Sequence, residues 1–425
     1  MANVSSSNGL EKRPKLRFPG FDEPWISQQF SCVFSFLQNN TLSRAELDSD
    51  GEVLNIHYGD VLIKFGSILD CNDKDIPHIA SGHESQNYQY LQNGDIIIAD
   101  TAEDETVGKA TELVNVSGRK VEAGLHTIPC RPLSCFASMY LGYYMNTPHF
   151  HRQLIPLMQG IKVLSISKGN IAKTKICAPK SMLEQQKISY LLNVLDRRTA
   201  AQRKVIEVLK KYKRGVFEAI FSRKLRLVSK EEQRDWKIFK LSDFASRIIR
   251  KNNGTTDIPL TISAQYGLID QRDFFSKVVA SADMSGYYLL RKGEYAYNRS
   301  TSNDYPFGSI KRLELYDKGA VSTLYLCFSV NENVMVNDFV KWYFESSQWY
   351  RSINEICAEG ARNHGLLNVP TDGFFNTTHI LPTDTKEQTV IATFLSLIQE
   401  KLEISQKGLN KLTELRNGLM QQLFI

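Results

Sequence analysis

The chain has 425 residues, of which 42% are hydrophobic and 23% are charged, and its formal net charge is +6. This length predicts two or three globular domains, and so mild a charge does not by itself indicate a nucleic-acid partner. The polar start of the chain is unlike a secretion signal and no run of about 18 apolar residues could span a bilayer, so we expect a soluble, cytoplasmic protein. Seven cysteines without CxxC or CxxH spacing argue against a disulfide framework and a structural zinc site.

In chain order, the sequence predicts a flexible tail over 1–15, a mixed α/β domain over 16–181 and a long helix over 182–228. A second α/β domain is expected over 229–382, and a second long helix over 383–425. This plan of domain, helix, domain, helix rests on an internal repeat, which is sought first because it determines the architecture.

The repeat is clearest in the two helices. Residues 184–221 align without a gap with residues 387–424. In both copies apolar residues recur at alternating steps of four and three, starting at Ile188 in the first copy and at Ile391 in the second, and no proline interrupts either copy. This spacing is a heptad seam, which is typical of coiled-coil helices.

Both helices also begin alike. Each copy has a proline outside the helix, a residue suited to N-capping and a glutamate three residues after the cap: Pro179, Ser181 and Glu184 in the first copy, and Pro382, Asp384 and Glu387 in the second. We therefore expect capping boxes, in which the glutamate side chain reaches back to the backbone of the cap residue.

The segments before the helices match more weakly. Trp25 matches Trp236, and the pattern Tyr-x-x-Leu-x-x-Gly followed by an acidic residue recurs at 88–95 and at 287–294. A β-branched or aromatic run, IIIAD in the first copy and YAYNR in the second, follows each pattern directly. Residues of these types predict a strand at that place in both copies.

Chain connectivity predicts the geometry of the helices. The second domain leaves the end of one helix and returns to the start of the other, and the termini of a compact domain usually lie close together. We therefore expect antiparallel helices, a rod of roughly 60 Å and a pseudo-twofold axis between the two domains. Such a rod could span the separation of about 34 Å between the readers of symmetric DNA-binding dimers. Lys213 and Arg416 occupy matching polar seam positions and could fix the antiparallel register.

With these features the chain resembles the specificity subunit of type I restriction-modification systems. The resemblance covers nearly the whole chain, and its most specific feature is the opening P-x-x-x-x-E-Q-x-x-I, which occurs at 179–188 and again at 382–391. It implies two α/β target recognition domains, each reading half of an asymmetric bipartite site in double-stranded DNA, and helices that set the spacer and dock two methyltransferase subunits. ATP-dependent restriction subunits would complete the complex, and the chain itself would need no cofactor.

The residues themselves indicate no catalytic site. The sequence lacks a G-x-x-x-x-G-K-[ST] phosphate loop, and its nearest string to the NPPY-like tetrapeptide of an amino-methyltransferase, 303–307, lacks adjacent prolines. No HExxH spacing occurs among the eight histidines, so we expect no metal. Two alternatives remain: a stand-alone methyltransferase or nuclease with fused recognition domains, and a repeat-built scaffold that binds proteins and not DNA.

Candidate DNA contacts follow the predicted strand of the second copy. Arg299 offers a forked guanidinium suited to a guanine edge, and Asn298, beside Ser300, offers an amide suited to adenine; the alternative is a solvated strand end. Lys311 and Arg312 could contact phosphates or form a solvated face.

Further candidates come from the comparison of the two copies. Lys162 and Arg362 end matching tripeptides, Gly-Ile-Lys and Gly-Ala-Arg, so a shared phosphate clamp competes with a brace for the following turn. Lys64, Lys109 and His364 are weaker candidates for DNA binding. The first copy has Ala-Asp-Thr where the second has Asn-Arg-Ser, which predicts two unlike half-sites.

The first long helix is markedly basic. Residues 182–228 contain 12 Lys or Arg against 4 Asp or Glu, whereas residues 386–425 contain 5 against 4. One hypothesis is that the end of the first helix faces the DNA spacer or an acidic partner, and the alternative is a solvated coiled-coil flank. The cations concerned are Lys210, Lys211, Lys213, Arg214, Arg223, Lys224 and Arg226.

Overall fold

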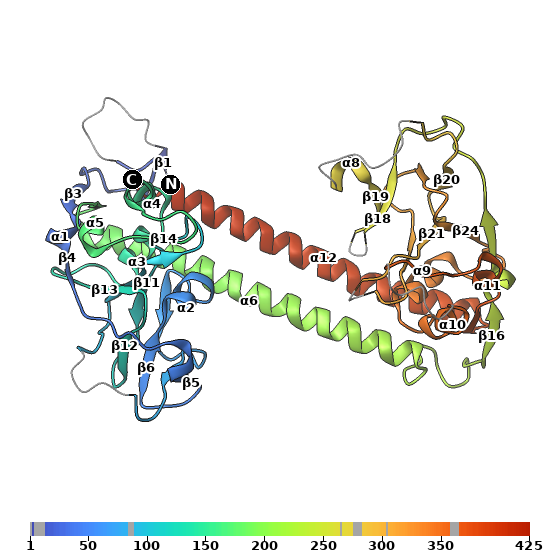
Figure 1. Ribbon diagram of the computed structural model, residues 1–425, viewed down its shortest axis with the longest axis horizontal. Coiled ribbons are helices and arrows are strands. Elements are labelled where there is room, and N and C mark those ends of the chain that lie inside the picture. Colours follow the sequence, from blue (N-terminus) through green and yellow to red (C-terminus); the bar gives the residue numbers. More distant parts are fainter. Residues whose placement is uncertain are drawn as a thin grey trace. The chain divides into compact units, whose positions relative to one another are not determined.

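The chain forms two compact units. The computed structural model describes residues 2–3, 13–83, 89–263, 266–274, 283–302, 305–357 and 365–425, so most of the tail expected over 1–15 lies outside the described residues. Unit 1 comprises Met1–Lys204 and Lys407–Ile425, and unit 2 comprises Val205–Gln406. Two long helices, α6 (Met182–Phe221) and α12 (Thr385–Gln422), each contribute one part to either unit (Figure 1). The predicted fold class, two α/β domains with two long helices, is confirmed.

The centre of unit 1 is a mixed sheet. Its strands lie in the order β4 (Phe34–Phe36), β13 (Thr127–Pro132), β9 (Ile96–Ala99), β11 (Ala110–Val114) and β7 (Ile68–Asp70); β11 and β7 are parallel and the other neighbours antiparallel. Strand β9 is buried on both faces, because Ile96 and Ile98 pack in one core while Ile97 and Ala99 pack in another. Burial on both faces explains why the tract is apolar throughout and does not alternate.

The remaining elements of unit 1 surround this sheet. A second sheet has the order β12 (Lys120–Ala123), β6 (Val53–Ile56), β8 (His78–Ile79) and β5 (Leu47–Asp48). Three strand pairs are β1 (Ala2–Asn3) with β2 (Leu16–Arg17), β3 (Ile26–Gln29) with β15 (Lys175–Ala178), and β10 (Thr101–Ala102) with β14 (Leu164–Ser165). The helices are α1 (Phe30–Val33), α2 (Tyr58–Ile63), α3 (Tyr140–Met145), α4 (Pro148–Leu154) and α5 (Lys168–Ile171), with 3-10 turns η1 (Arg44–Glu46) and η2 (Ile155–Leu157).

Unit 2 repeats the central part of this plan. Its main sheet has the order β17 (Ala245–Ile248), β24 (Leu326–Val330), β21 (Tyr295–Asn298) and β22 (Ser309–Arg312), antiparallel throughout. The predicted strand β21 is again buried on both faces, with Tyr295 and Tyr297 in the core that includes α6 and α12, and Ala296 in the other core.

The other elements of unit 2 complete the domain. Strand pairs are β16 (Trp236–Lys240) with β25 (Thr378–Pro382), β18 (Leu260–Ser263) with β19 (Gly267–Asp270), and β20 (Tyr288–Arg291) with β23 (Lys318–Val321). The helices are α7 (Leu241–Phe244), α8 (Gln271–Phe274), α9 (Asn337–Glu345), α10 (Tyr350–Ile356) and α11 (Thr371–Phe375).

The glycine pattern that precedes the central strand makes the same turn in both units. Gly94 and Gly293 have φ angles of 85° and 88°, a region that glycine enters without the steric cost of a side chain. The backbone N–H of Gly94 donates to Leu113 at 2.8 Å, and that of Gly293 donates to Leu313 at 2.8 Å. The weak sequence match between the domains therefore reflects a shared turn.

Each unit contains antiparallel portions of α6 and α12. In unit 1, Leu192 of α6 and Leu423 of α12 lie in one core. In unit 2, Ile220 of α6 and Ile391 of α12 lie in one core. The antiparallel course predicted from connectivity is therefore confirmed within each unit. In the described part of the chain, no helix is long and apolar enough to cross a membrane.

Candidate functional site

A buried ion pair anchors the start of α6 to its domain. The Glu184 carboxylate accepts hydrogen bonds from Nε and Nη2 of Arg17, at 2.7 and 2.9 Å, and from Nε1 of Trp25 at 3.4 Å. Glu184 is 1% exposed and Arg17 is 5% exposed. A bidentate arginine supplies both charge and fixed geometry, so the first turn of α6 is held in one defined position on the domain.

The start of α12 carries the same anchor in unit 2. The Glu387 carboxylate accepts from Nε and Nη2 of Arg226, at 2.5 and 2.8 Å, and from Nε1 of Trp236 at 3.3 Å. The predicted pairing of the two tryptophans in the repeat is thus explained, because both donate to the helix glutamate.

The glutamines that follow these glutamates clamp the same junction. The side-chain amide of Gln185 donates to the carbonyl of the proline before the helix at 2.9 Å and accepts from the backbone N–H of Ala137 at 2.9 Å. The side-chain amide of Gln388 likewise donates to the Pro382 carbonyl at 2.8 Å and accepts from the backbone N–H of Val336 at 2.7 Å. The Glu-Gln motif is therefore a structural junction between helix and domain.

The capping-box prediction is wrong for the glutamates and right for the caps. Ser181 accepts from the backbone N–H of Glu184 at 3.3 Å, and Asp384 accepts from that of Lys386 at 2.9 Å. The Glu184 and Glu387 carboxylates instead bind the arginines, since two charge-assisted hydrogen bonds to a buried guanidinium are stronger than one bond to a neutral N–H.

The two polar seam residues make matching contacts between the helices. In unit 2, Nζ of Lys213 donates to Gln399 at 2.7 Å, and in unit 1, Nε of Arg416 lies 2.5 Å from Asp196. Asp196 and Gln399 are themselves matching positions of the repeat. Burial lowers the pKa of Lys213. These contacts favour the hypothesis that Lys213 and Arg416 fix the antiparallel register.

Arg299 braces two loops of unit 2. Its Nη2 donates to the Leu324 carbonyl at 3.0 Å, and its Nη1 lies 3.5 Å from the Val369 carbonyl. Asn298 accepts from the backbone N–H of Ser300 at 3.0 Å, while Ser300 is exposed. The guanidinium is thus engaged with backbone carbonyls, which disfavours the expected pairing with a guanine edge.

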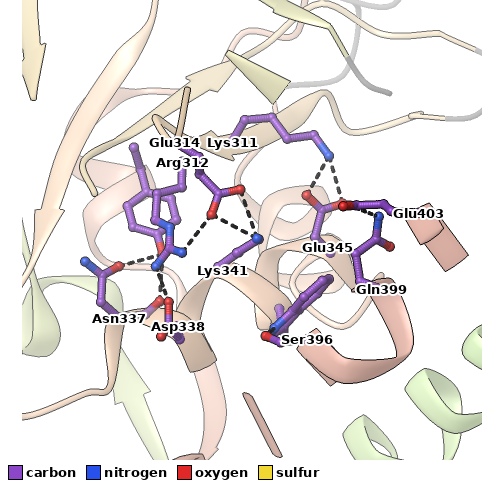
Figure 2. A network of polar contacts seen from close by, with 12 residues as sticks. Lys311, Arg312, Glu314, Asn337, Asp338, Lys341, Glu345, Ser396, Gln399 and Glu403 are labelled. Atoms are coloured by element: carbon purple, nitrogen blue, oxygen red, sulfur yellow. Dashed lines mark hydrogen bonds and ion pairs between the residues drawn. The ribbon is translucent and has the colours of Figure 1, made fainter. Parts of the chain in front are cut away.

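Lys311 and Arg312 belong to a network of ion pairs beside α9, which Figure 2 shows from close by. Nζ of Lys311 lies 2.7 Å from Glu345, and Lys311 is only 7% exposed. Arg312 reaches Asp338 and Glu314, each at 2.8 Å. Because these charges are compensated within the domain, the geometry favours a bracing role for both cations over phosphate contact.

The cations expected in loops are placed differently from one another. Lys162 is exposed at the tip of a turn closed by reciprocal backbone bonds between Gln159 and Ser165, at 2.9 and 2.8 Å. Lys64 is exposed and donates to the Asp75 carbonyl. Lys109 is partly buried, donates to the Leu62 carbonyl at 2.6 Å, and has a pKa lowered by burial. Arg362 and His364 lie outside the described residues.

Sequence reasoning missed the surroundings of Asp100, which takes the place of Arg299 in unit 1. The Asp100 carbonyl accepts from Ile166 at 2.8 Å, as the Arg299 carbonyl accepts from Leu367 at 3.0 Å. Nδ1 of His126 lies 3.3 Å from the Asp100 carboxylate, and His126 has a φ of 54°, which is uncommon for a residue with a side chain. The unlike tripeptides at these positions were the signal available in the sequence.

The basic end of α6 divides into engaged and exposed cations. Lys213 contacts α12 and Arg226 anchors Glu387, which favours a structural role for these two over contact with DNA or a partner. The exposed cations are Lys210, Lys211, Arg214, Arg223 and Lys224. For these the hypothesis stays a prediction.

In each unit a strand residue holds the start of a neighbouring helix, α3 in unit 1 and α9 in unit 2, and the two strand residues are of opposite charge type. In unit 1, Glu112 of β11 accepts from the backbone N–H groups of Met139 and Gly142, at 2.6 and 2.8 Å, and burial raises its pKa to about 7. In unit 2, Arg312 of β22 binds Asp338 in the first turn of α9 instead. Among the described residues, no three His, Cys, Asp or Glu side chains form a group that could hold a metal ion.

Comparison with known proteins finds similarity at the level of fold. No protein-family model matches the chain, and no curated protein matches its sequence. The type I restriction-modification S subunit of M. genitalium is similar with a TM-score of 0.58 and 14% identity, over 97% of this chain and 99% of that one. A chain from a structural study of complex assembly and conformational transition in the type I system is similar with a TM-score of 0.52 and 14% identity, over 97% and 99% of the two chains. The chain therefore has the fold of the S subunits of type I restriction-modification systems.

Proposed function

We propose that the chain is the DNA-reading specificity subunit of a type I restriction-modification complex and catalyses no reaction itself. The observation that carries this proposal is the S-subunit fold over 97% of the chain. The duplicated anchor at Glu184 and Glu387 supports it, since it seats two recognition domains on the helices in the same way.

In this proposal the domains over 16–181 and 229–382 each read one half of a bipartite site. The corresponding tripeptides Ala-Asp-Thr at 99–101 and Asn-Arg-Ser at 298–300 differ in sequence, which supports two unlike half-sites and hence an asymmetric target. Lys162 fits a phosphate contact better than Lys311 does, because Lys162 is exposed whereas Lys311 is buried in an ion pair. Asn298, Ser300 and Lys64 remain candidates at the same interface.

The helices over 182–228 and 383–425 would set the spacer and dock two methyltransferase subunits, and restriction subunits would join them in the cytoplasm. Base flipping and methyl transfer would then belong to the methyltransferases. The chain alone should show no activity on DNA.

The test is to express the chain with the methyltransferase encoded beside it and to map methylated adenines by single-molecule sequencing. We expect a two-part motif with a fixed gap, of which one half changes when residues 229–382 are exchanged for another recognition domain. Methylation of a continuous palindrome, or no complex at all, would refute the proposal. The matched control is a chain in which residues 16–181 are exchanged, because it should change the other half only.

A further inference from the structure

The helix pair of unit 2 exposes an apolar face that no described part of the chain covers. This face, here called stripe 2, consists of Val205, Val208 and Tyr212 of α6 and Leu397 and Ile404 of α12. These residues are 46% to 67% exposed. Isolated exposed apolar residues need no explanation, but a contiguous group marks an interaction site.

The five side chains lie on one side of the helix pair. Each immediately precedes a seam position in the sequence, which places it about 100° around its helix from the seam. Lys401, between Leu397 and Ile404, also precedes a seam position and is exposed, and its counterpart in unit 1 is Arg198, so both faces carry a cation there. The same angular offset on two antiparallel helices points to the same side of the pair. The steps of three and four within Val205, Val208 and Tyr212 are those that a further helix packs against.

The matching positions of unit 1 are poorer in apolar surface. This second face, stripe 1, consists of Gly408, Lys411 and Leu415 of α12 and Val194 and Ala201 of α6. Of these, Val194 and Leu415 are the large apolar side chains, at 42% and 51% exposure. A lysine thus stands where stripe 2 has Val208, and a glycine where it has Val205.

From this difference we infer that the two faces bind the same partner with unequal strength. The inference rests on the proposed function, in which two identical methyltransferase subunits dock on the helices. The occupant of each stripe is an amphipathic helix of that subunit, since the stripes continue the heptad spacing of an existing helix interface. Stripe 2 binds the first subunit, and stripe 1 binds the second more weakly.

The magnitude follows from apolar area. Burial of apolar side chains stabilises a complex in proportion to the area removed from water, and three large apolar side chains of stripe 2, Val205, Val208 and Ile404, lack a counterpart in stripe 1. Entropic costs of ordering reduce the surplus, so the first subunit should bind roughly 10- to 100-fold more tightly than the second.

The test is a titration of the intact chain with the methyltransferase encoded beside it, followed by native mass spectrometry. We expect the 1:1 complex to accumulate before the 2:1 complex, beyond the ratio for two equal sites. Val208→Lys should weaken the first step about tenfold, and Lys411→Val should strengthen the second. Glu207→Lys is the matched control, because Glu207 is exposed on α6 but follows a seam position and so lies outside the stripe, and it should leave both steps unchanged.

The possible outcomes separate this inference from the proposed function. Equal filling of two sites, or a Val208→Lys variant that binds as the parent chain does, would overturn the inference alone. A dimer of the chain itself that Val208→Lys dissociates would assign stripe 2 to self-association and also overturn it. Absence of any complex with the methyltransferase would overturn both the inference and the proposed function.

Discussion

Replacing Arg17 with methionine should loosen the start of α6 and leave the start of α12 unchanged. Methionine keeps the length of the side chain but leaves the Glu184 carboxylate, at 1% exposure, without its charged partner. Removing one member of a buried ion pair costs about 3–5 kcal/mol, and each 1.4 kcal/mol is about tenfold in an equilibrium constant. Opening of the first turns of α6 should therefore become at least roughly 100-fold more frequent.

The assay is hydrogen exchange by mass spectrometry on the intact chain, with peptides that cover 182–195 and 385–398. The second peptide is an internal control, because the Arg226–Glu387 pair that holds it is untouched. We expect faster exchange in the first peptide only.

A double variant tests the cause of the loss. In Arg17→Met with Glu184→Gln, the neutral amide leaves no unpaired charge in the junction, so much of the protection lost in the single variant should return. Equal exchange of both peptides in the single variant would refute the anchor. A double variant no better protected than Arg17→Met would refute the stranded charge as its cause.

Three further predictions concern the domains. Arg299→Ala should lower the stability of unit 2 by about 1.5–3 kcal/mol in urea unfolding while the methylated motif stays the same; a stable variant with one relaxed base would contradict the brace. Lys162→Ala should weaken binding of all DNA sequences and reduce the salt slope by about one, whereas Lys311→Met should lower stability without changing that slope. Burial raises the pKa of Glu112 to about 7 from its ordinary 4.5, so the stability that its protonated form gives unit 1 is lost as the pH rises from about 4.5 to 7. Burial lowers the pKa of His379 to about 4 from 6.5, so unit 2 loses stability as the pH falls from about 6.5 to 4. Pulse proteolysis in urea should show these opposite trends, and Glu112→Gln and His379→Gln should each abolish one.

The long helices were predictable because their determinants are local. Steps of three and four mark the seam, and Ser181 and Asp384 cap the helices as expected. The role of Glu184 was not predictable in this way, since its partner Arg17 is 167 positions away in the sequence. A capping box and a long-range ion pair both require a glutamate at this position, and the sequence pattern alone does not distinguish them.

The candidate DNA contacts show a different limit. A cation in a predicted loop is expected to be exposed, and Lys162 is exposed. Lys311 has the same chemistry in the sequence, but it lies at 7% exposure against Glu345. Burial of a cation depends on an acidic partner supplied by tertiary structure, so composition and spacing cannot separate a phosphate contact from a brace.

The contrast between Glu112 and Arg312 explains why the repeat is strong in the helices and weak in the domains. Both residues tie the start of a helix to the neighbouring strand, yet Glu112 does so by accepting from backbone N–H groups and Arg312 by binding Asp338. An acidic side chain is favourable at a helix N-terminus whether it comes from the strand or from the helix. The strand residue can therefore be acidic in one domain and basic in the other, provided that its partner at the helix start changes as well. The helices have less freedom, because each seam residue must fit the partner helix as well as its own domain. The spacing of the seam and the identity of the Glu-Gln anchor are therefore retained in both helices, while the domains keep the fold and change the residues.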